Sequence, residues 1–184
     1  MHHELNHFLS SVEKKAFRMA QLATKDADHA LDIVQDTMMV LSQKYADKKP
    51  QDWPALFYRI LQNKIIDWHR KQNTKNKLFS LFGFFNDGLE TNDNAETANH
   101  YPVNKTMAPD KAMENTDINN RTLHAIEQLP LRQQQVFLLR QWQGLSVRET
   151  ANAMSISEGS VKTHYSRAIG QLKIKLEDIY YEQA

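Results

Sequence analysis

The sequence predicts an all-α protein with two small helical domains joined by a flexible acidic linker. Apolar residues recur at helical spacing on both sides of the chain's middle, and strand-like alternation is almost absent. Residues 1–77 carry 13 Lys or Arg and 9 Asp or Glu, residues 78–120 carry 2 and 7, and residues 121–184 carry 8 and 6, which sum to the net charge of +1. A chain of 184 residues can hold two small domains. We therefore place the domains at 1–77 and 118–184, with the linker at 78–117.

The composition excludes several classes of protein. The chain has no cysteine, which excludes disulfides and thiolate metal sites. No apolar run approaches the roughly 18 residues that would predict a membrane span, and the N-terminus lacks the basic start and apolar stretch of a signal peptide. We therefore expect a soluble cytoplasmic protein. Two basic blocks around an acidic one indicate two modules that face nucleic acid.

The first domain is predicted to contain three helices, at residues 5–23, 26–45 and 54–71. A polar break at 48–52 separates the last two, and Pro54 is tolerated in the first turn of a helix. The third helix is expected to turn its apolar residues inward: Trp53, Phe57, Ile60, Leu61, Ile65 and Trp68.

The linker is rich in Asn, Thr, Asp and Glu, and we expect it to be largely disordered. Its exception is the apolar segment Leu78–Phe85, which is far too short to span a bilayer. Two interpretations stay open for this segment: packing on the first domain, or docking on a partner.

Four helices are predicted in the second domain. The first covers about 118–128, and Pro130 opens a second that ends before a left-handed cap at Gly144. Ser146 and Glu149 have the spacing of a capping box, which predicts the start of a short third helix. Ser157 can cap a fourth helix that continues to about residue 176.

The last two helices have the pattern of a helix-turn-helix. Ala151 lies where only a small side chain lets the second helix cross closely, Ile156 fills the turn, and Val161 is the first inward residue of the second helix. The opposite side of that helix presents short polar groups and two cations, which suit a DNA major groove. We expect the DNA-contacting residues to be Ser157, Ser160, Lys162, Thr163, Ser166 and Arg167.

The segments 129–140, 144–146 and 156–163 resemble region four of sigma factors, which reads the −35 promoter element. Residues 156–172 also resemble the output domain of two-component response regulators, so this half of the chain leaves both families open. Thr150 stands where sigma factors usually carry a large aliphatic residue.

The N-terminal half favours the sigma factors. Residues 32–37 resemble the region-two helix that docks on the polymerase clamp, and residues 57–68 resemble the segment that melts and reads the −10 element. Two such halves in this order, over 1–77 and 118–176, are similar to the extracytoplasmic-function class. The resemblance implies core RNA polymerase (clamp and flap regions) and promoter DNA as partners. An anti-sigma factor is a further partner that commonly accompanies this family.

The resemblance also assigns candidate residues in the first domain. The residues implied to bind core polymerase are Asp32, Gln35 and Asp36. The residues implied to bind −10 DNA are Tyr58, Arg59, Asn63, Lys64, Trp68, Arg70 and Lys71. Aromatic and amide groups beside a cationic track suit the capture of an unstacked base. Asn63 is the strongest of these candidates, because an amide is a poor choice for a buried helix face. For Trp68, a place in the core stays open.

Two competing functions have weaker support in the sequence. A response-regulator-like activator would need a phosphoacceptor aspartate after a buried strand, and residues 1–77 predict no strand. His3, Glu4 and His7 match the zinc-protease pattern, but a zinc enzyme needs a third ligand and a walled cleft. We therefore expect a DNA-binding protein that is not an enzyme, without catalytic residues, metal or cofactor.

Overall fold

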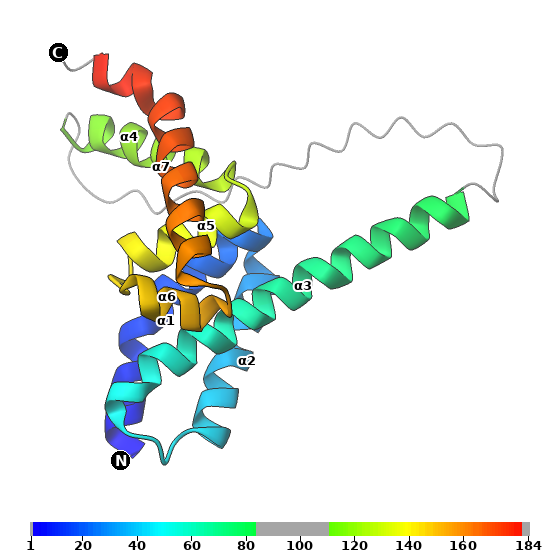
Figure 1. The fold of residues 1–184 in the computed structure, drawn as a ribbon, viewed down its shortest axis with the longest axis vertical. Helices are drawn as coiled ribbons and strands as arrows, with labels where there is room; N and C mark the ends of the chain where they lie inside the picture. The colour runs from blue at the N-terminus through cyan, green and yellow to red at the C-terminus, as the bar shows by residue number, and fades with distance from the viewer. Residues whose placement is uncertain (1, 84–110, 182–184) are drawn as a thin grey trace.

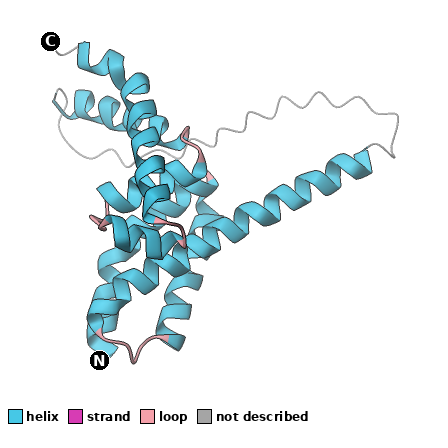
Figure 2. Cartoon of the chain, viewed as in Figure 1, coloured by secondary structure: helices cyan, strands magenta, loops and turns pink. Residues whose placement is uncertain are grey.

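The structure is a computed structural model that describes the backbone of residues 2–83 and 111–181 and the side chains of residues 3–74 and 119–177. Within these ranges every regular element is a helix, which confirms the predicted all-α class (Figure 1, Figure 2). The helices of the described residues are α1 (His2–Thr24), α2 (Ala27–Lys44), the 3₁₀ helix η1 (Pro50–Asp52), α3 (Trp53–Gly83), α4 (Lys111–Glu127), α5 (Leu131–Gln141), α6 (Val147–Met154) and α7 (Glu158–Tyr181).

Helices α1, α2 and α3 form the first unit. Asp26 caps α2 by accepting a hydrogen bond from the backbone N–H of His29 at 2.8 Å, as expected for a helix that starts there. The indole N–H of Trp53 donates to the carbonyl of Tyr45 at 3.1 Å, which fixes the start of α3 against the end of α2. The side chain of Phe57 is fully buried.

Helix α3 is longer than predicted, because it continues to Gly83 instead of ending near residue 71. Neither proline nor glycine interrupts residues 72–82, so the polar composition there did not mark a helix end. Figure 1 shows this distal part of α3 extending away from the other helices. The side chains of the apolar segment Leu78–Phe85 lie outside the described residues, as does the central part of the expected linker, residues 84–110.

Helices α4 to α7 form the second unit, and the structure confirms its predicted left-handed turn and capping box. Gly144 adopts φ +66°, in the left-handed region. Ser146 and Glu149 form a complete capping box at the start of α6. Ser155 ends α6 with φ 53°, a left-handed conformation that costs a residue with a side chain more than it costs glycine. The predicted start of this unit's first helix, near residue 118, is wrong, because α4 begins at Lys111, inside the expected linker.

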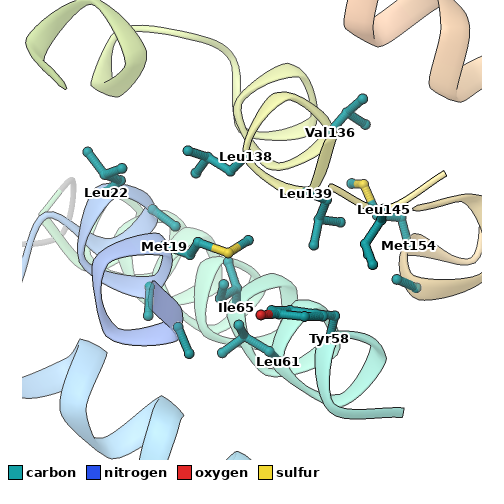
Figure 3. Close-up of a cluster of buried hydrophobic side chains, with 14 of the residues drawn as sticks. Met19, Leu22, Tyr58, Leu61, Ile65, Val136, Leu138, Leu139, Leu145 and Met154 are labelled. Carbon is teal, nitrogen blue, oxygen red and sulfur yellow. The ribbon is translucent and has the colours of Figure 1, made fainter. Parts of the chain in front are cut away.

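The two units pack on each other and share one buried cluster. Helix α3 contacts α6, and α1 contacts both α4 and α5. Figure 3 shows the side chains that meet there. The first unit contributes Met19, Leu22, Tyr58, Leu61 and Ile65, and the second contributes Leu138, Leu139, Leu145 and Met154, all of them buried. The apolar area removed from water at this seam stabilises the packing of the two units on each other.

Candidate polymerase and DNA interfaces

The outward face of α2 carries the three residues predicted to bind polymerase. Asp32, Gln35 and Asp36 are all exposed and lie within about one helical turn of each other. Two large apolar side chains lie in the same region of the surface: Leu31 is 45% exposed and Met39 is 54% exposed. An acidic face with exposed apolar groups suits docking on a protein surface.

Leu31 and Met39 belong to this candidate surface by their exposure and were not predicted from the sequence. A signal was present, because Met39 falls seven residues after Asp32 and four after Gln35, on the face opposite the buried Ala30, Val34 and Leu41. An apolar residue at such a position is not needed by the core.

The outward side of α3 presents one stripe of exposed polar residues. Arg59, Asn63 and Arg70 share this stripe and are all exposed. The amide of Asn63 makes no hydrogen bond to any described residue. Arg70 lies 3.5 Å from the carboxylate of Asp67, a largely solvated contact of the kind that contributes little to stability. This stripe is therefore free to bind a ligand.

A second stripe of α3, formed by Lys64, Trp68 and Lys71, is turned towards α2. The ammonium of Lys64 is 2.9 Å from a carboxylate oxygen of Asp36, and so connects the candidate DNA surface with the candidate polymerase surface. Trp68 is half-buried, and its ring meets the ring of His29 at a centroid distance of 5.5 Å. Trp68 thus contributes to packing as well as to this surface, and Lys71 is exposed.

His69 on the same helix turns inward. Its Nε2 is 2.9 Å from the carbonyl oxygen of Ala23, so the ring fastens α3 to the end of α1. Burial lowers the pKa of this imidazole, and the hydrogen bond to the carbonyl opposes the effect only in part.

Tyr58 does not lie on either exposed stripe. Its side chain is 3% exposed, and its hydroxyl donates to the side-chain carbonyl of Gln143 at 2.5 Å. Burial raises the pKa of the Tyr58 phenol well above its ordinary value. The predicted role of Tyr58 as a stacking group for DNA therefore requires an arrangement in which the second unit no longer covers it.

Helix α7 separates its buried stripe from its polar stripe as the helix-turn-helix pattern predicts. Val161, Ala168 and Leu172 are buried. The exposed residues of the other face include Ser157, Lys162, Thr163, Ser166 and Arg167, whereas Ser160 is half-buried.

Ser157 caps the start of α7. The hydroxyl oxygen of Ser157 accepts a hydrogen bond from the backbone N–H of Ser160 at 3.1 Å, and the two hydroxyls are 2.8 Å apart. Thr163 donates to the carbonyl of Gly159 at 3.0 Å. The cations Lys162 and Arg167 thus remain the groups on this face best placed to meet phosphates or base edges.

Other kinds of site find no support in the described part of the chain. His3 and His7 are exposed on the first turns of α1, and no group of three or more potential metal ligands occurs among the described residues. Among the described helices, none combines the length and the apolar character that crossing a bilayer requires.

Two protein-family models match the chain. Sigma-70 region 2 matches residues 5–75, and sigma-70 region 4 matches residues 120–172. The chain is 28% identical to the RNA polymerase sigma factor SigV of Bacillus subtilis over 162 residues, which cover 87% of this chain and 83% of SigV. It is 26% identical to the ECF RNA polymerase sigma factor SigX of the same organism, over 83% of this chain and 73% of SigX.

A solved structure has a similar fold. This is the sigma factor RpoE of Bartonella quintana, crystallised in complex with the anti-sigma factor NepR. The match has a TM-score of 0.65 at 20% identity and covers 94% of this chain and 96% of the other. The correspondence therefore extends over both helical units.

Proposed function

Because the chain belongs to the extracytoplasmic-function subfamily of the sigma-70 factors, we propose that α2 docks on core RNA polymerase, α3 reads the −10 element and α7 reads the −35 element. As a sigma factor, the chain binds core RNA polymerase and directs promoter-specific transcription initiation. One observation carries the assignment of α2, α3 and α7 to their partners: polar and charged groups lie outward on all three helices. The helices also occur along the chain in the order of regions 2 and 4.

The polymerase surface comprises Asp32, Gln35 and Asp36 with the exposed side chains of Leu31 and Met39. We propose that the carboxylates bind a basic surface on the polymerase clamp and that the apolar groups supply contact area. We propose that the second unit, α4 to α7, contacts the flap of the polymerase. We also propose a second protein partner, an anti-sigma factor, because the RpoE relative was crystallised with one.

The promoter surfaces use cations for affinity and polar groups for sequence. On α3, Arg59, Lys64, Arg70 and Lys71 hold phosphates while Asn63 contacts an extruded base. On α7, Lys162 and Arg167 approach the major groove with the hydroxyls of the same face. The protein acts by binding and positioning in the cytoplasm, where RNA polymerase works, and itself catalyses no reaction.

The competing functions lose their support. The region 2 match covers the part of the chain where a response-regulator activator would need its receiver domain. A zinc peptidase would need a third ligand near His3 and His7, and the described residues offer none in the required grouping.

Reconstitution with core RNA polymerase tests the assignment of α2. The full chain should co-purify with core polymerase, and Asp32→Ala or Met39→Ala should weaken this binding roughly tenfold, about 1.4 kcal/mol. Both side chains are exposed, so the variants should unfold at the wild-type temperature. Asp47→Ala removes an exposed carboxylate outside α2 and serves as the charge-matched control. Wild-type affinity in both α2 variants would show that polymerase docks elsewhere.

A further inference from the structure

We propose that the pocket between α1 and the end of α5 binds a mononucleotide that carries two or more phosphates. This α1–α5 pocket has a volume of about 360 Å³ and is lined by three cations and two aromatic side chains: Lys14, Lys15, Phe17, Arg18 and Trp142. Its size lies at the small end of the range of about 300–1,000 Å³ that is usual for ligand sites. None of its residues belongs to the surfaces assigned above to polymerase or promoter DNA, so the proposal does not rest on the proposed function.

The three cations of the pocket lie close together on α1. Lys14 and Arg18 are four residues apart and Lys15 and Arg18 are three apart, spacings at which side chains are neighbours on a helix surface and like charges destabilise the helix. None of the three forms an ion pair with a carboxylate among the described residues. A bound polyanion would neutralise this charge and make charge-assisted hydrogen bonds with it.

The two aromatic side chains of the pocket are available for stacking. Phe17 and Trp142 are half-buried against the core, and neither ring contacts another ring within the described part of the chain. The indole N–H of Trp142 is not buried and has no hydrogen-bond partner among the described residues. A ring face with a free donor beside it suits the base of a nucleotide.

Contacts within the protein hold the two walls of the pocket in place. The backbone N–H of Trp142 donates to the carbonyl of Leu138 at 2.9 Å, and the ammonium of Lys15 donates to the carbonyl of Trp142 at 3.3 Å. The amide N–H of Gln62 on α3 donates to the side-chain oxygen of Gln135 on α5 at 2.9 Å, and both residues are buried. A site whose walls are positioned before the ligand arrives loses less entropy on binding.

The combination of cations and free rings selects for an anion that also carries a planar ring. Inorganic phosphate would use only the cations, and an uncharged aromatic molecule would use only the rings. Duplex DNA offers phosphates but keeps its bases stacked inside the helix, so it would also leave the rings unused. A nucleotide uses both groups, because its base stacks on Trp142 or Phe17 while Arg18 and the two lysines bind its phosphates.

Calorimetric titration of the full chain tests the pocket. The probes are the common ribonucleoside di- and triphosphates, with the corresponding nucleosides and inorganic triphosphate as the base-only and phosphate-only controls. At least one nucleotide should bind with one-to-one stoichiometry and a dissociation constant below about 1 mM. Its nucleoside and inorganic triphosphate should each bind at least about tenfold more weakly. The bound nucleotide should also raise the unfolding temperature, because it binds the folded chain.

Variants of the ring and of the cations locate the bound nucleotide. Trp142→Leu removes the ring and should weaken binding roughly 5- to 150-fold, whereas Trp142→Phe keeps a ring and should lose less. Lys14→Gln combined with Lys15→Gln should weaken binding by about fivefold or more. Lys48→Gln combined with Lys49→Gln removes another pair of adjacent exposed lysines and should leave the affinity unchanged. If Trp142→Leu fails to fold, Trp142→Phe and the lysine variants still decide.

Several results would refute the pocket. One is the absence of saturable binding by any of these nucleotides at about 1 mM. Another is a nucleotide affinity that the ring and lysine variants leave unchanged. Equal affinity for inorganic triphosphate would show that the cations act alone. If nucleotides do not bind and the Lys14 and Lys15 variant loses affinity for duplex DNA of arbitrary sequence, these lysines form a DNA surface instead. Failure to bind polymerase would contradict only the proposed function.

Discussion

Replacing Asn63 by alanine removes the amide that we propose to hold an extruded base of the −10 element. The side chain is exposed and makes no hydrogen bond to any described residue, so the substitution leaves no buried group unpaired. Alanine is also a better helix former than asparagine. The free energy of unfolding should therefore be unchanged or rise by a few tenths of a kcal/mol.

The expected functional loss follows from the contacts that the amide can make. An amide offers a donor and an acceptor, and a good bidentate contact to a base edge is worth about 1–3 kcal/mol. At 1.4 kcal/mol per factor of ten, open-complex formation should fall about 5- to 140-fold. Extruding a base costs a few kcal/mol, so the loss should appear in melting and leave polymerase binding and −35 recognition nearly intact.

The assay compares open-complex formation on a duplex promoter with that on the same promoter carrying a pre-opened mismatch bubble. The promoter is chosen by selection with the wild-type reconstituted holoenzyme. The defect of Asn63→Ala should shrink on the bubble template, because the cost of extrusion is already met there. Asn73→Ala removes an exposed amide further along the same helix and provides the matched control. Wild-type melting of duplex promoters by Asn63→Ala would show that the −10 reading site is misplaced.

Three further predictions concern α7, the turn before it and the first unit. Arg167→Ala should weaken −35 binding by about 1–3 kcal/mol if Arg167 contacts a base edge. If Arg167 contacts a phosphate, the variant should instead lower affinity for all DNA sequences and reduce the dependence of log affinity on log salt concentration by about one. Lys175→Ala is the cationic control. Unchanged promoter binding in both Arg167→Ala and Lys162→Ala would contradict the assignment of α7. Ser155→Gly should raise the free energy of unfolding by about 0.5–1 kcal/mol in urea titrations, because relief of the left-handed conformation is offset only in part by the greater freedom of glycine in the unfolded chain. Since the pKa of His69 is lower in the folded protein than the unfolded value of about 6.5, its contribution to stability is complete above that pH and is lost as the pH falls towards the folded pKa. His69→Gln should reduce the loss of stability between pH 7.5 and about pH 5.5, and an unchanged pH profile would show that His69 titrates normally.

Sequence signals within a few residues of each other predicted most of the fold and part of the candidate site. The capping box at Ser146, the left-handed Gly144 and the inward position of Val161 each depend on neighbours a few residues away, and each was predictable. The outward position of Asn63 followed from the rule that amides avoid buried helix faces. The full length of α3 was not predictable from composition, because polar residues lower the apolar signal without ending a helix.

The same rule failed at the seam between the units. Gln62 and Gln135 are buried although each stands on a helix with exposed positions to spare. Their burial depends on a partner 73 residues away in sequence, and no periodicity within one helix reports such a pairing. The covered position of Tyr58 has the same origin, since Gln143 comes from the other unit.

The ion pair between Lys64 and Asp36 has a consequence for how the two partners of this protein influence each other. If polymerase captures the carboxylate of Asp36, the ammonium of Lys64 is released for a phosphate, and DNA that takes Lys64 likewise frees Asp36. Thermodynamic reciprocity requires that the two effects on affinity be equal. Because the Asp36 side chain is largely solvated, the coupling is limited to about 1 kcal/mol, or about fivefold, and it weakens as salt is added. Under the proposed assignment of Asp36 to polymerase and Lys64 to DNA, this one surface contact makes protein binding and DNA binding mutually cooperative, by a small and ionic-strength-dependent amount.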